Sequence, residues 1–273
     1  MRLGISSYTF TWGIGVEGFE KPPNPLSVFD LLAKARELEV EVLQVCDNIP
    51  AGQLDEDTVR QLASKSREYG IALEFGTRGL DEDNILRYIE ICSCCNAKIL
   101  RTILIGSEFQ DLDTTVERLK RFIPLLEQQG IIMVLENHST HTAAQLKHII
   151  QSVNSEHLGI CLDTVNSFQN LECPDQVIDT LIDISKNIHI KDFDIIRVNG
   201  QMGFSIFGTP AGSGKLNIPE ILRRIKDADI SLVLELWTPF ESNIIDTIGT
   251  EDRWAKESMI YLKKVLKSIK HNS

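Results

Sequence analysis

The sequence lacks any apolar run long enough to cross a membrane. Its longest runs, residues 131–135 and 230–236, fall far short of the roughly 18 residues that a membrane helix needs. The amino terminus also lacks the apolar segment and small-residue cleavage site of a secretory signal, because Met1-Arg2 leads directly into Leu3-Gly4-Ile5-Ser6. We therefore expect a protein that does not span a membrane and that is cytoplasmic.

Positive charge is scarce, since 28 Lys and Arg residues stand against 39 Asp and Glu residues, for a net charge of −11. Proteins that bind a phosphate backbone usually carry a basic surface, so this balance argues against nucleic acid as a partner. A glycine-rich dinucleotide fingerprint is missing after the first apolar run, residues 3–6. Gly212-Ser213-Gly214-Lys215 is similar to a phosphate loop, but Leu216 stands where Ser or Thr is required. A bound nucleotide is therefore not expected.

The sequence lacks a second C-x-x-C motif, which a zinc site built from two cysteine pairs would need. Six cysteines are present, and Cys92 and Cys95 form a single C-x-x-C within one predicted helix. Cys46 and Cys161 lie inside apolar, strand-like runs. Buried free thiols in a reducing compartment are the better interpretation of this pattern.

What the sequence does contain is a regular alternation of apolar runs and amphipathic segments. The composition, 42% hydrophobic and 25% charged, is ordinary for a chain that can bury a large core. Asp55, Asp81 and Thr142 stand where N-caps are expected, and Gly70 and Gly130 where C-caps are expected. Strand-like runs begin near residues 3, 42, 71, 98, 131, 158, 187 and 231, and helix-like segments span residues 25–39, 55–69, 81–95, 112–129, 142–153, 174–185, 218–227 and 250–269.

Eight strands in strict alternation with eight helices predict a parallel sheet with helical crossovers. The mean spacing of the runs is close to the roughly 31 residues per unit of a 250-residue eightfold barrel, whereas an open doubly wound sheet usually stops at about five or six strands. We therefore predict an α/β chain with a single domain, a (β/α)8 TIM barrel over residues 1–273. Two long connections, residues 193–216 and 237–249, are expected to be lids or substrate-contacting loops.

Four polar residues end the last four apolar runs: Glu136, Asp163, His189 and Glu235. The parallel strands of a barrel end on one face, where such folds hold their catalytic residues, so these four side chains are expected to converge. Three carboxylates and one imidazole favour Mn²⁺, with Mg²⁺, Co²⁺ and Zn²⁺ as alternatives. The sequence thus predicts one divalent-metal site.

Two further polar residues share strand faces with these candidate ligands. Lys191 follows His189 by two positions, and His138 follows Glu136 by two, which is the repeat of side chains on one face of a strand. Lys191 is expected to bind an oxyanion or act as a general acid, unless it reaches solvent at the strand end. His138 is a candidate acid, base or hydroxyl binder, with a structural role as the alternative.

The motifs at these strand ends resemble the xylose isomerase-like TIM-barrel superfamily of sugar isomerases, epimerases and dehydratases. The resemblance spans essentially the whole chain, and it implies that the four strand-end residues bind one divalent metal and that the two glutamates exchange protons with substrate. The motifs are Leu135-Glu136-Asn137-His138, Leu162-Asp163-Thr164, His189-Ile190-Lys191-Asp192 and Glu235-Leu236-Trp237.

This resemblance implies a metal-dependent isomerase or epimerase of a small sugar, sugar phosphate or keto-sugar. A metal would polarise the substrate carbonyl and stabilise an enediolate, with Glu136 and Glu235 as the acid/base pair. If His138 or Lys191 instead expels a β-leaving group, the enzyme is a lyase, like inosose dehydratases or the eliminases that cleave 3-keto-glycosides. A barrel that binds sugar without turnover is the third hypothesis.

Several residues depart from particular members of this superfamily. Ketose 3-epimerases and abasic-site endonucleases carry a histidine where this chain has Asn166, and the endonucleases need further metal histidines where Asp47, Glu74 and Arg101 stand. Arg101 is expected to contact a substrate anion or to pair with a strand carboxylate such as Glu74. We therefore expect a small-molecule sugar substrate, no nucleic acid and no membrane, and a homo-oligomer stays open.

Overall fold

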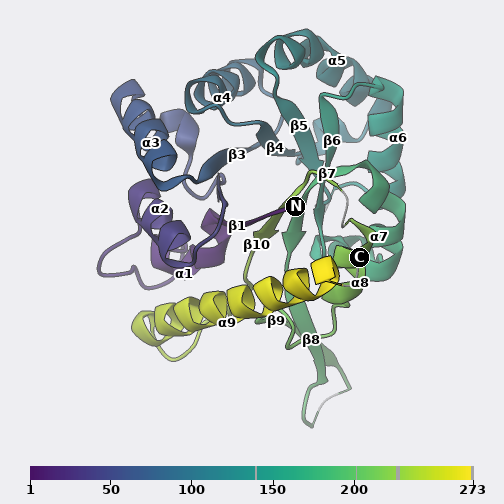
Figure 1. The fold of residues 1–273 in the computed structure, drawn as a ribbon. Coiled ribbons are helices and arrows are strands. Elements are labelled where there is room, and N and C mark those ends of the chain that lie inside the picture. The colour runs from purple at the N-terminus through teal and green to yellow at the C-terminus, as the bar shows by residue number, and fades with distance from the viewer. Residues whose placement is uncertain (139, 201, 226–227, 272–273) are drawn as a thin grey trace.

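Eight parallel strands close into a barrel inside a ring of helices, as predicted (Figure 1). The computed structural model describes residues 1–138, 140–200, 202–225 and 228–271. The barrel closes because β1 pairs with β2 on one side and with β10 on the other. Its strands are β1 (Arg2–Ser6), β2 (Val42–Val45), β3 (Ala72–Arg78), β4 (Ile99–Ile103), β5 (Ile132–Glu136), β6 (Leu158–Asp163), β7 (Ser185–Ile190) and β10 (Ser231–Leu234).

The helices that surround the barrel begin and end close to the predicted positions. Asp55, Asp81 and Thr142 accept hydrogen bonds from the first helical turn, and Gly70 and Gly130 adopt left-handed C-cap conformations with φ of 67° and 61°. The helices are α1 (Thr11–Ile14), α2 (Val28–Glu37), α3 (Glu56–Tyr69), α4 (Glu82–Cys95), α5 (Leu112–Gln129), α6 (Ala143–Val153), α7 (Pro174–Leu181), α8 (Ile218–Arg224) and α9 (Ile244–His271). Short 3-10 turns are η1 (Ser7–Phe10), η2 (Ala51–Gln53), η3 (Ser107–Phe109), η4 (Asn166–Asn170) and η5 (Ile182–Ile184).

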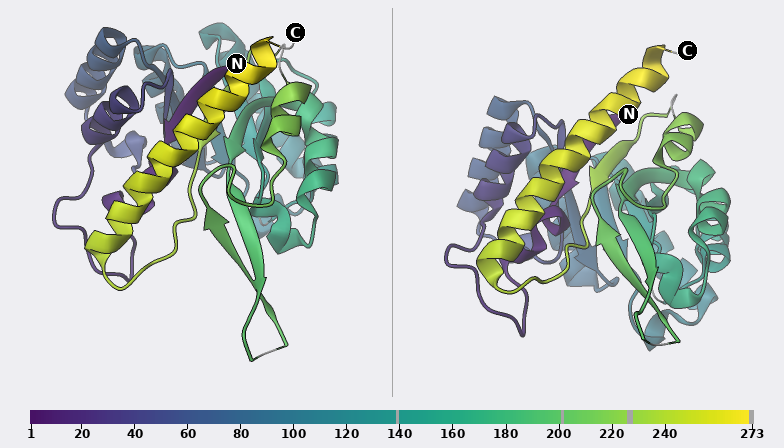
Figure 2. Two further views of the ribbon diagram at one scale, coloured as in Figure 1. Left: turned by 60° about the horizontal axis from the view of Figure 1, so that its bottom comes forward. Right: turned by 90° about the horizontal axis from the view of Figure 1, so that it is seen from below.

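The segment after β7 differs from the predicted loop over residues 193–216. Strands β8 (Asp192–Arg197) and β9 (Phe204–Thr209) pair antiparallel into a ribbon that projects away from the barrel (Figure 2). Asn199-Gly200 lies in the turn between the strands, with a φ of 74° at Gly200, and such a dipeptide is a strong hairpin signal. The second predicted loop is also shorter than expected, because α9 begins at Ile244 rather than near residue 250.

The glycine-rich segment after β9 wraps around a carboxylate of its own chain. Asp192 accepts hydrogen bonds from the backbone N–H groups of Gly212 (2.8 Å), Gly214 (3.0 Å) and Leu216 (3.0 Å). A Cβ atom at Gly214 would lie 2.3 Å from Oδ1 of Asp192, so a side chain does not fit there. The segment that is similar to a phosphate loop is therefore already filled by an internal anion.

The two faces of the barrel strands have opposite character. Apolar side chains such as Ile5, Leu43 and Phe75 join those of the helices in the main hydrophobic core. Inside the barrel, Ile99, Val134 and Cys161 form a small separate apolar cluster, and much of the remaining interior is polar and buried. Buried polar groups are costly unless they are hydrogen-bonded, so this interior requires a specific network. The polar interior residues are Ser6, Gln44, Glu74, Arg101, Asn187, His189 and Ser231.

The six cysteines are all free thiols. Cys46, Cys92, Cys95 and Cys161 are buried, and burial raises the pKa of each of these thiols above its ordinary value. They therefore remain protonated packing residues at neutral pH. Within the described residues, no helix is both long and apolar enough to cross a membrane.

Candidate metal and active site

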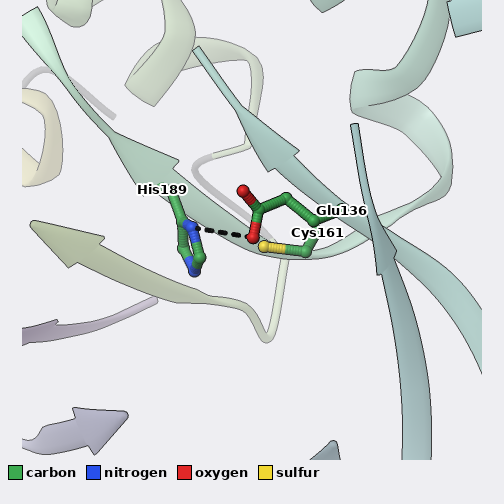
Figure 3. A group of neighbouring side chains, drawn as sticks. All are labelled: Glu136, Cys161 and His189. Carbon is green, nitrogen blue, oxygen red and sulfur yellow. Dashed lines mark ion pairs between the residues drawn. The ribbon is translucent and has the colours of Figure 1, made fainter. Parts of the chain in front are cut away.

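Glu136, Asp163, His189 and Glu235 come together at the carboxyl ends of β5, β6, β7 and β10. Nδ1 of His189 lies 3.4 Å from Oε1 of Glu235, 3.6 Å from Oε2 of Glu136 and 3.9 Å from Oδ2 of Asp163. All four side chains are buried. Figure 3 shows Glu136 and His189 pointing toward one another, with Cys161 beside them. The structure thus has the convergence that the strand ends predicted, while the role of these residues as metal ligands stays a prediction.

The donor atoms in this cluster fit a divalent cation. Nδ1 of His189 is buried and has no hydrogen-bond partner among the described residues, although it faces three carboxylates. Its ring is held from the other side, because Nε2 lies 2.7 Å from Oε1 of Gln44. Three carboxylates and one imidazole form a set of hard oxygen donors with one nitrogen, which suits Mn²⁺, Mg²⁺, Co²⁺ or Zn²⁺. A cation among these atoms would satisfy the unpaired nitrogen and offset the carboxylate charges.

Cys161 lies close enough to this cluster to be considered as a ligand. Its Sγ, one oxygen of Glu136 and one nitrogen of His189 lie within 4.8 Å of one another. However, burial raises the pKa of the thiol well above its ordinary value, and Sγ donates a hydrogen bond to Oδ1 of Asn187 at 3.0 Å. A metal ligand needs the thiolate. We therefore assign Cys161 to the packing beneath the site.

Lys191 points into the cluster and does not reach solvent. Its Nζ lies 2.8 Å from both Oδ2 of Asp163 and Oε2 of Glu235. Burial by itself would lower the pKa of Lys191, but the charges of Asp163 and Glu235 outweigh that effect and raise the pKa above its ordinary value. Lys191 is therefore a fixed positive charge at neutral pH. The Trp237 ring lies over it, with 6.0 Å between Nζ and the ring centroid.

Arg101 is fully buried, and it pairs with different carboxylates from the one expected. Its Nε donates to Oε2 of Glu136, and its Nη1 lies 2.7 Å from Oδ1 of Asp47. The expected alternative partner, Glu74, instead accepts hydrogen bonds from the barrel interior. Asn166 donates to the other oxygen of Glu136 at 2.6 Å. Both oxygens of Glu136 are thus already engaged by the protein.

A cavity of about 530 Å³ opens over this cluster. His138 lies on its wall, and burial lowers the pKa of this imidazole despite the opposing charge of Glu136. His138 is therefore neutral at neutral pH and can both donate and accept a hydrogen bond. The polar residues that line the cavity are Tyr8, Thr11, Arg78, Arg101, Glu136, His138, Asn166, Lys191, Glu235 and Thr238.

One wall of the cavity is aromatic. Trp12 and Phe19 line it and pack edge to face with ring centroids 4.9 Å apart, and Phe240 packs against both. The Trp12 indole N–H donates to the backbone oxygen of Thr238 at 2.7 Å, which fixes its orientation. The cavity therefore combines a charged floor with an apolar wall.

Two residues around the cluster were missed by sequence reasoning. Gln44 lies in the middle of β2 outside any motif, and its only signal was a polar residue at an inward position of a buried strand. Tyr8 follows β1, donates to Oδ2 of Asp47 at 2.9 Å and accepts a hydrogen bond from Arg78 at 3.2 Å. These contacts join strands far apart in sequence, so local patterns could not reveal them.

Comparison with known proteins gives a family match and a full-length relative. The family model described as xylose isomerase-like TIM barrel matches residues 32–265. The chain is 30% identical over 265 residues to a 3-oxo-isoapionate decarboxylase from Pectobacterium atrosepticum, and the match covers 96% of this chain and 95% of that protein.

Solved structures show the same fold at lower identity. A xylose isomerase-like TIM barrel protein from Mycobacterium smegmatis in complex with magnesium superposes with a TM-score of 0.71 at 15% identity, over 98% of this chain and 97% of that one. D-psicose 3-epimerase from Clostridium cellulolyticum H10, solved with D-tagatose, also gives 0.71 at 15% identity, over 97% of this chain and 99% of that one. At this identity the likeness shows the fold.

Proposed function

This chain belongs to the xylose isomerase-like TIM barrel family, and from that premise we propose that it is a divalent-metal-dependent lyase that releases carbon dioxide from a 3-oxo sugar acid. The substrate class is supported by the full-length likeness to a 3-oxo-isoapionate decarboxylase at 30% identity. The sequence alone favoured the isomerase or epimerase reaction. The charge pattern in the cavity favours an anionic substrate, which a sugar phosphate also is, and the likeness to the decarboxylase moves the preference from an isomerase to a lyase that releases carbon dioxide.

The observation that carries this proposal is the set of cationic side chains in the cavity. Arg78, Arg101 and Lys191 all line it. With a divalent cation bound, their charge and that of the ion exceed the charge of the four nearby carboxylates, so an anionic substrate is attracted. The four carboxylates are Asp47, Glu136, Asp163 and Glu235. A sugar acid fits this balance better than a neutral sugar does.

The hydrogen bonds that Glu136 accepts also favour a reaction in which no carboxylate acts as a base. Arg101 and Asn166 donate hydrogen bonds to its two oxygens, so neither oxygen is free to face a substrate carbon. Decarboxylation of a 3-oxo acid needs no base for its first step. The bond between C2 and the carboxylate carbon breaks, CO₂ leaves, and the electron pair passes to the ketone oxygen as an enolate.

The residues of this chain can then complete the reaction. Carbon C2 of the enolate takes one proton, which Lys191 is placed to supply as an ammonium group among the strand ends. An enolate carbon is a far stronger base than an amine, so the raised pKa of Lys191 does not prevent this transfer. His138 would hold a substrate hydroxyl in its neutral form. A bound divalent ion would act as a Lewis acid toward the ketone.

The aromatic wall suits the departing group. A carboxylate held against Trp12 and Phe19 would lose part of its hydration, and neutral CO₂ would not. Such a wall also keeps bulk water from the reacting carbon. We therefore place the carboxylate of the substrate on the side of Trp12 and its C3 oxygen on the side of the metal cluster.

Isomerisation or epimerisation of a keto-sugar is the second candidate. It is supported by the presence of both Glu136 and Glu235 on the cavity wall, since this reaction needs one group to remove a proton and another to return it. In this reaction no carbon is lost, and hydrogen from solvent enters the carbon next to the carbonyl.

The two reactions can be separated with the Mn²⁺-loaded protein in D₂O. The substrate panel comprises 3-oxo sugar acids, including 3-oxo-isoapionate, together with ketoses, their phosphates and inososes. We expect release of ¹³CO₂ from a carboxyl-labelled 3-oxo acid and one deuterium on the product carbon that was C2 of the substrate. Deuterium exchange into a ketose without CO₂ from any acid would support the isomerase instead, and loss of water from an inosose would support a dehydratase.

A lysine variant tests the proton donor. K191M should lower kcat for the decarboxylation by about 10²- to 10⁴-fold, because it removes the proton donor of the final step. K215M is the matched control, since Lys215 pairs with Asp194, is about half exposed and does not line the cavity. Equal rates for K191M and K215M would rule out this role.

A further inference from the structure

A polar network fills the barrel beneath the candidate metal ligands. Glu74 on β3 accepts hydrogen bonds from the hydroxyl of Ser231 (2.6 Å) and from the amides of Gln44 and Asn187 (3.0 Å each). These residues come from four different strands and are all buried. Within the described part of the chain, the network meets the metal cluster through Gln44, whose Oε1 lies 2.7 Å from Nε2 of His189.

The network fixes which way the Gln44 amide points. Its nitrogen faces two acceptors, Oε2 of Glu74 at 3.0 Å and Oδ1 of Asn187 at 3.3 Å. If the amide were reversed, its oxygen would face Oδ1 of Asn187, an amide oxygen that has no proton to donate. The orientation of an amide is set by such a network. Oε1 of Gln44 must therefore face His189 as an acceptor.

The orientation of Gln44 in turn fixes the imidazole. An acceptor 2.7 Å from Nε2 requires that Nε2 carry a proton and donate it. In the neutral ring the lone pair then lies on Nδ1, the atom that faces Glu136, Asp163 and Glu235. A ring with the opposite tautomer would present a proton to the cation.

We propose that Gln44 is a positioning residue that, held by Glu74, keeps His189 as the Nε2–H tautomer and so aims the Nδ1 lone pair at the metal. This inference rests on the metal dependence of the proposed function, but it does not depend on the substrate. Groups that hold the second nitrogen of a metal-binding histidine commonly change metal affinity by 10- to 100-fold. The role reaches across the barrel, because Gln44 lies on β2 and His189 on β7.

The network offers a matched pair of substitutions. Q44L removes the acceptor for His189 while keeping an inward, branched side chain that is one heavy atom shorter than that of glutamine. C46A is the control, since the Cys46 thiol donates to the same Oε1 of Gln44 at 3.3 Å. Among the described residues, the imidazole of His189 is hydrogen-bonded by Gln44 and not by Cys46. Q44E is the conservative variant in its protonated form, because a neutral carboxyl group can donate to Glu74 through one oxygen and accept from His189 through the other.

Metal affinity is measured by isothermal titration of each metal-free protein with Mn²⁺ and Zn²⁺. We expect about 10- to 100-fold weaker binding in Q44L, a value close to wild type in C46A, and a value in Q44E that lies nearer to wild type than that of Q44L. Equal affinities in Q44L and C46A would overturn the proposal. Circular dichroism of the metal-free proteins checks that each variant folds.

Nitrogen-15 NMR of the Zn²⁺-loaded wild-type protein gives a second test that needs no variant. The proposal expects zinc on Nδ1 of His189 and a proton on Nε2 that exchanges slowly with solvent. Zinc on Nε2 would disprove the proposal even if Q44L failed to fold. If wild-type protein bound neither ion, the proposed function would fall as well, whereas metal binding without decarboxylation would contradict the proposed function alone.

Discussion

The charged residues at the floor of the cavity are buried and form ion pairs with one another. Arg101 is 2% exposed and lies between Glu136 and Asp47, and Lys191 lies between Asp163 and Glu235. Transfer of such charges from water is costly, and removal of one partner leaves the other unpaired in a medium of low polarity. Each charge on this floor therefore depends on its partners for stability as well as for chemistry.

Arg101 provides a direct test of this dependence. R101M should lower the free energy of unfolding by about 3–5 kcal/mol, because it leaves the buried charge of Glu136 without its arginine partner and removes one of the two arginines that pair with Asp47. Urea unfolding of the metal-free protein measures the change. R78M is the matched control, since Arg78 also pairs with Asp47 but is about half exposed and should cost at most about 1 kcal/mol. Equal losses for both variants would contradict the prediction.

A double substitution separates lost charge pairing from lost packing. Adding E136Q to R101M removes the carboxylate charge that R101M leaves without its arginine, so the double variant should recover part of the stability that R101M loses. If the recovery is nil, the loss in R101M comes from the missing volume of the side chain.

Among the elements, α9 fixes the aromatic wall through a buried carboxyl group. Glu251 on α9 accepts hydrogen bonds from the backbone N–H groups of Trp12 (3.0 Å) and Gly13 (3.1 Å) in α1. Burial raises the pKa of Glu251 to about 8, against the lowering effect of those two hydrogen bonds. The packing of α1 on α9 therefore depends on pH.

The sign of that dependence follows from the two protonation states. The folded protein holds a proton on Glu251 up to a pKa of about 8, whereas the unfolded chain releases it near the ordinary value of 4.5. Folding stability should thus fall as pH rises from about 4.5 to about 8, and E251Q should flatten this part of the profile. Urea unfolding at several pH values measures it, and an unchanged slope in E251Q would count against the assignment.

The elements also show what the sequence could and could not reveal. The strands and long helices were predictable because period-two and helical patterns, N-caps such as Asp81 and C-caps such as Gly70 act locally. The β8–β9 ribbon was missed, although Asn199-Gly200 carries a hairpin signal, because a connection after a barrel strand was assumed to be irregular. Local signals outweigh such an assumption about topology.

At the scale of the whole molecule, the convergence of the strand-end residues could be predicted from the sequence, because all strands of a parallel barrel end on the same face. Their partners could not be predicted in this way. The pairing of Arg101 with Asp47, and the contact of Gln44 with His189, depend on side-chain directions across the barrel interior. Such contacts follow from packing rather than from the order of residues along the chain.

Metal binding should stabilise the whole molecule. An ion that binds the folded chain alone, at 100 times its dissociation constant, should raise the free energy of unfolding by about 2.7 kcal/mol, and a chelator should reverse the gain. Thermal unfolding with and without Mn²⁺ measures the shift. D163N should abolish it, because the substitution removes one candidate ligand, whereas K215M should retain it. A shift of equal size in D163N would place the ion elsewhere.

Because the polar network inside the barrel contacts a candidate metal ligand, metal affinity can be used to follow closure of the barrel. The candidate ligands lie between β5 and the residue after β10, whereas Gln44 and Glu74 lie on β2 and β3. Neither half of the chain therefore contains both the ligands and the network beneath them. The part of the metal affinity that depends on Gln44 would therefore return during refolding only when β2 and β7 lie in one closed barrel, a step that the secondary structure alone does not reveal.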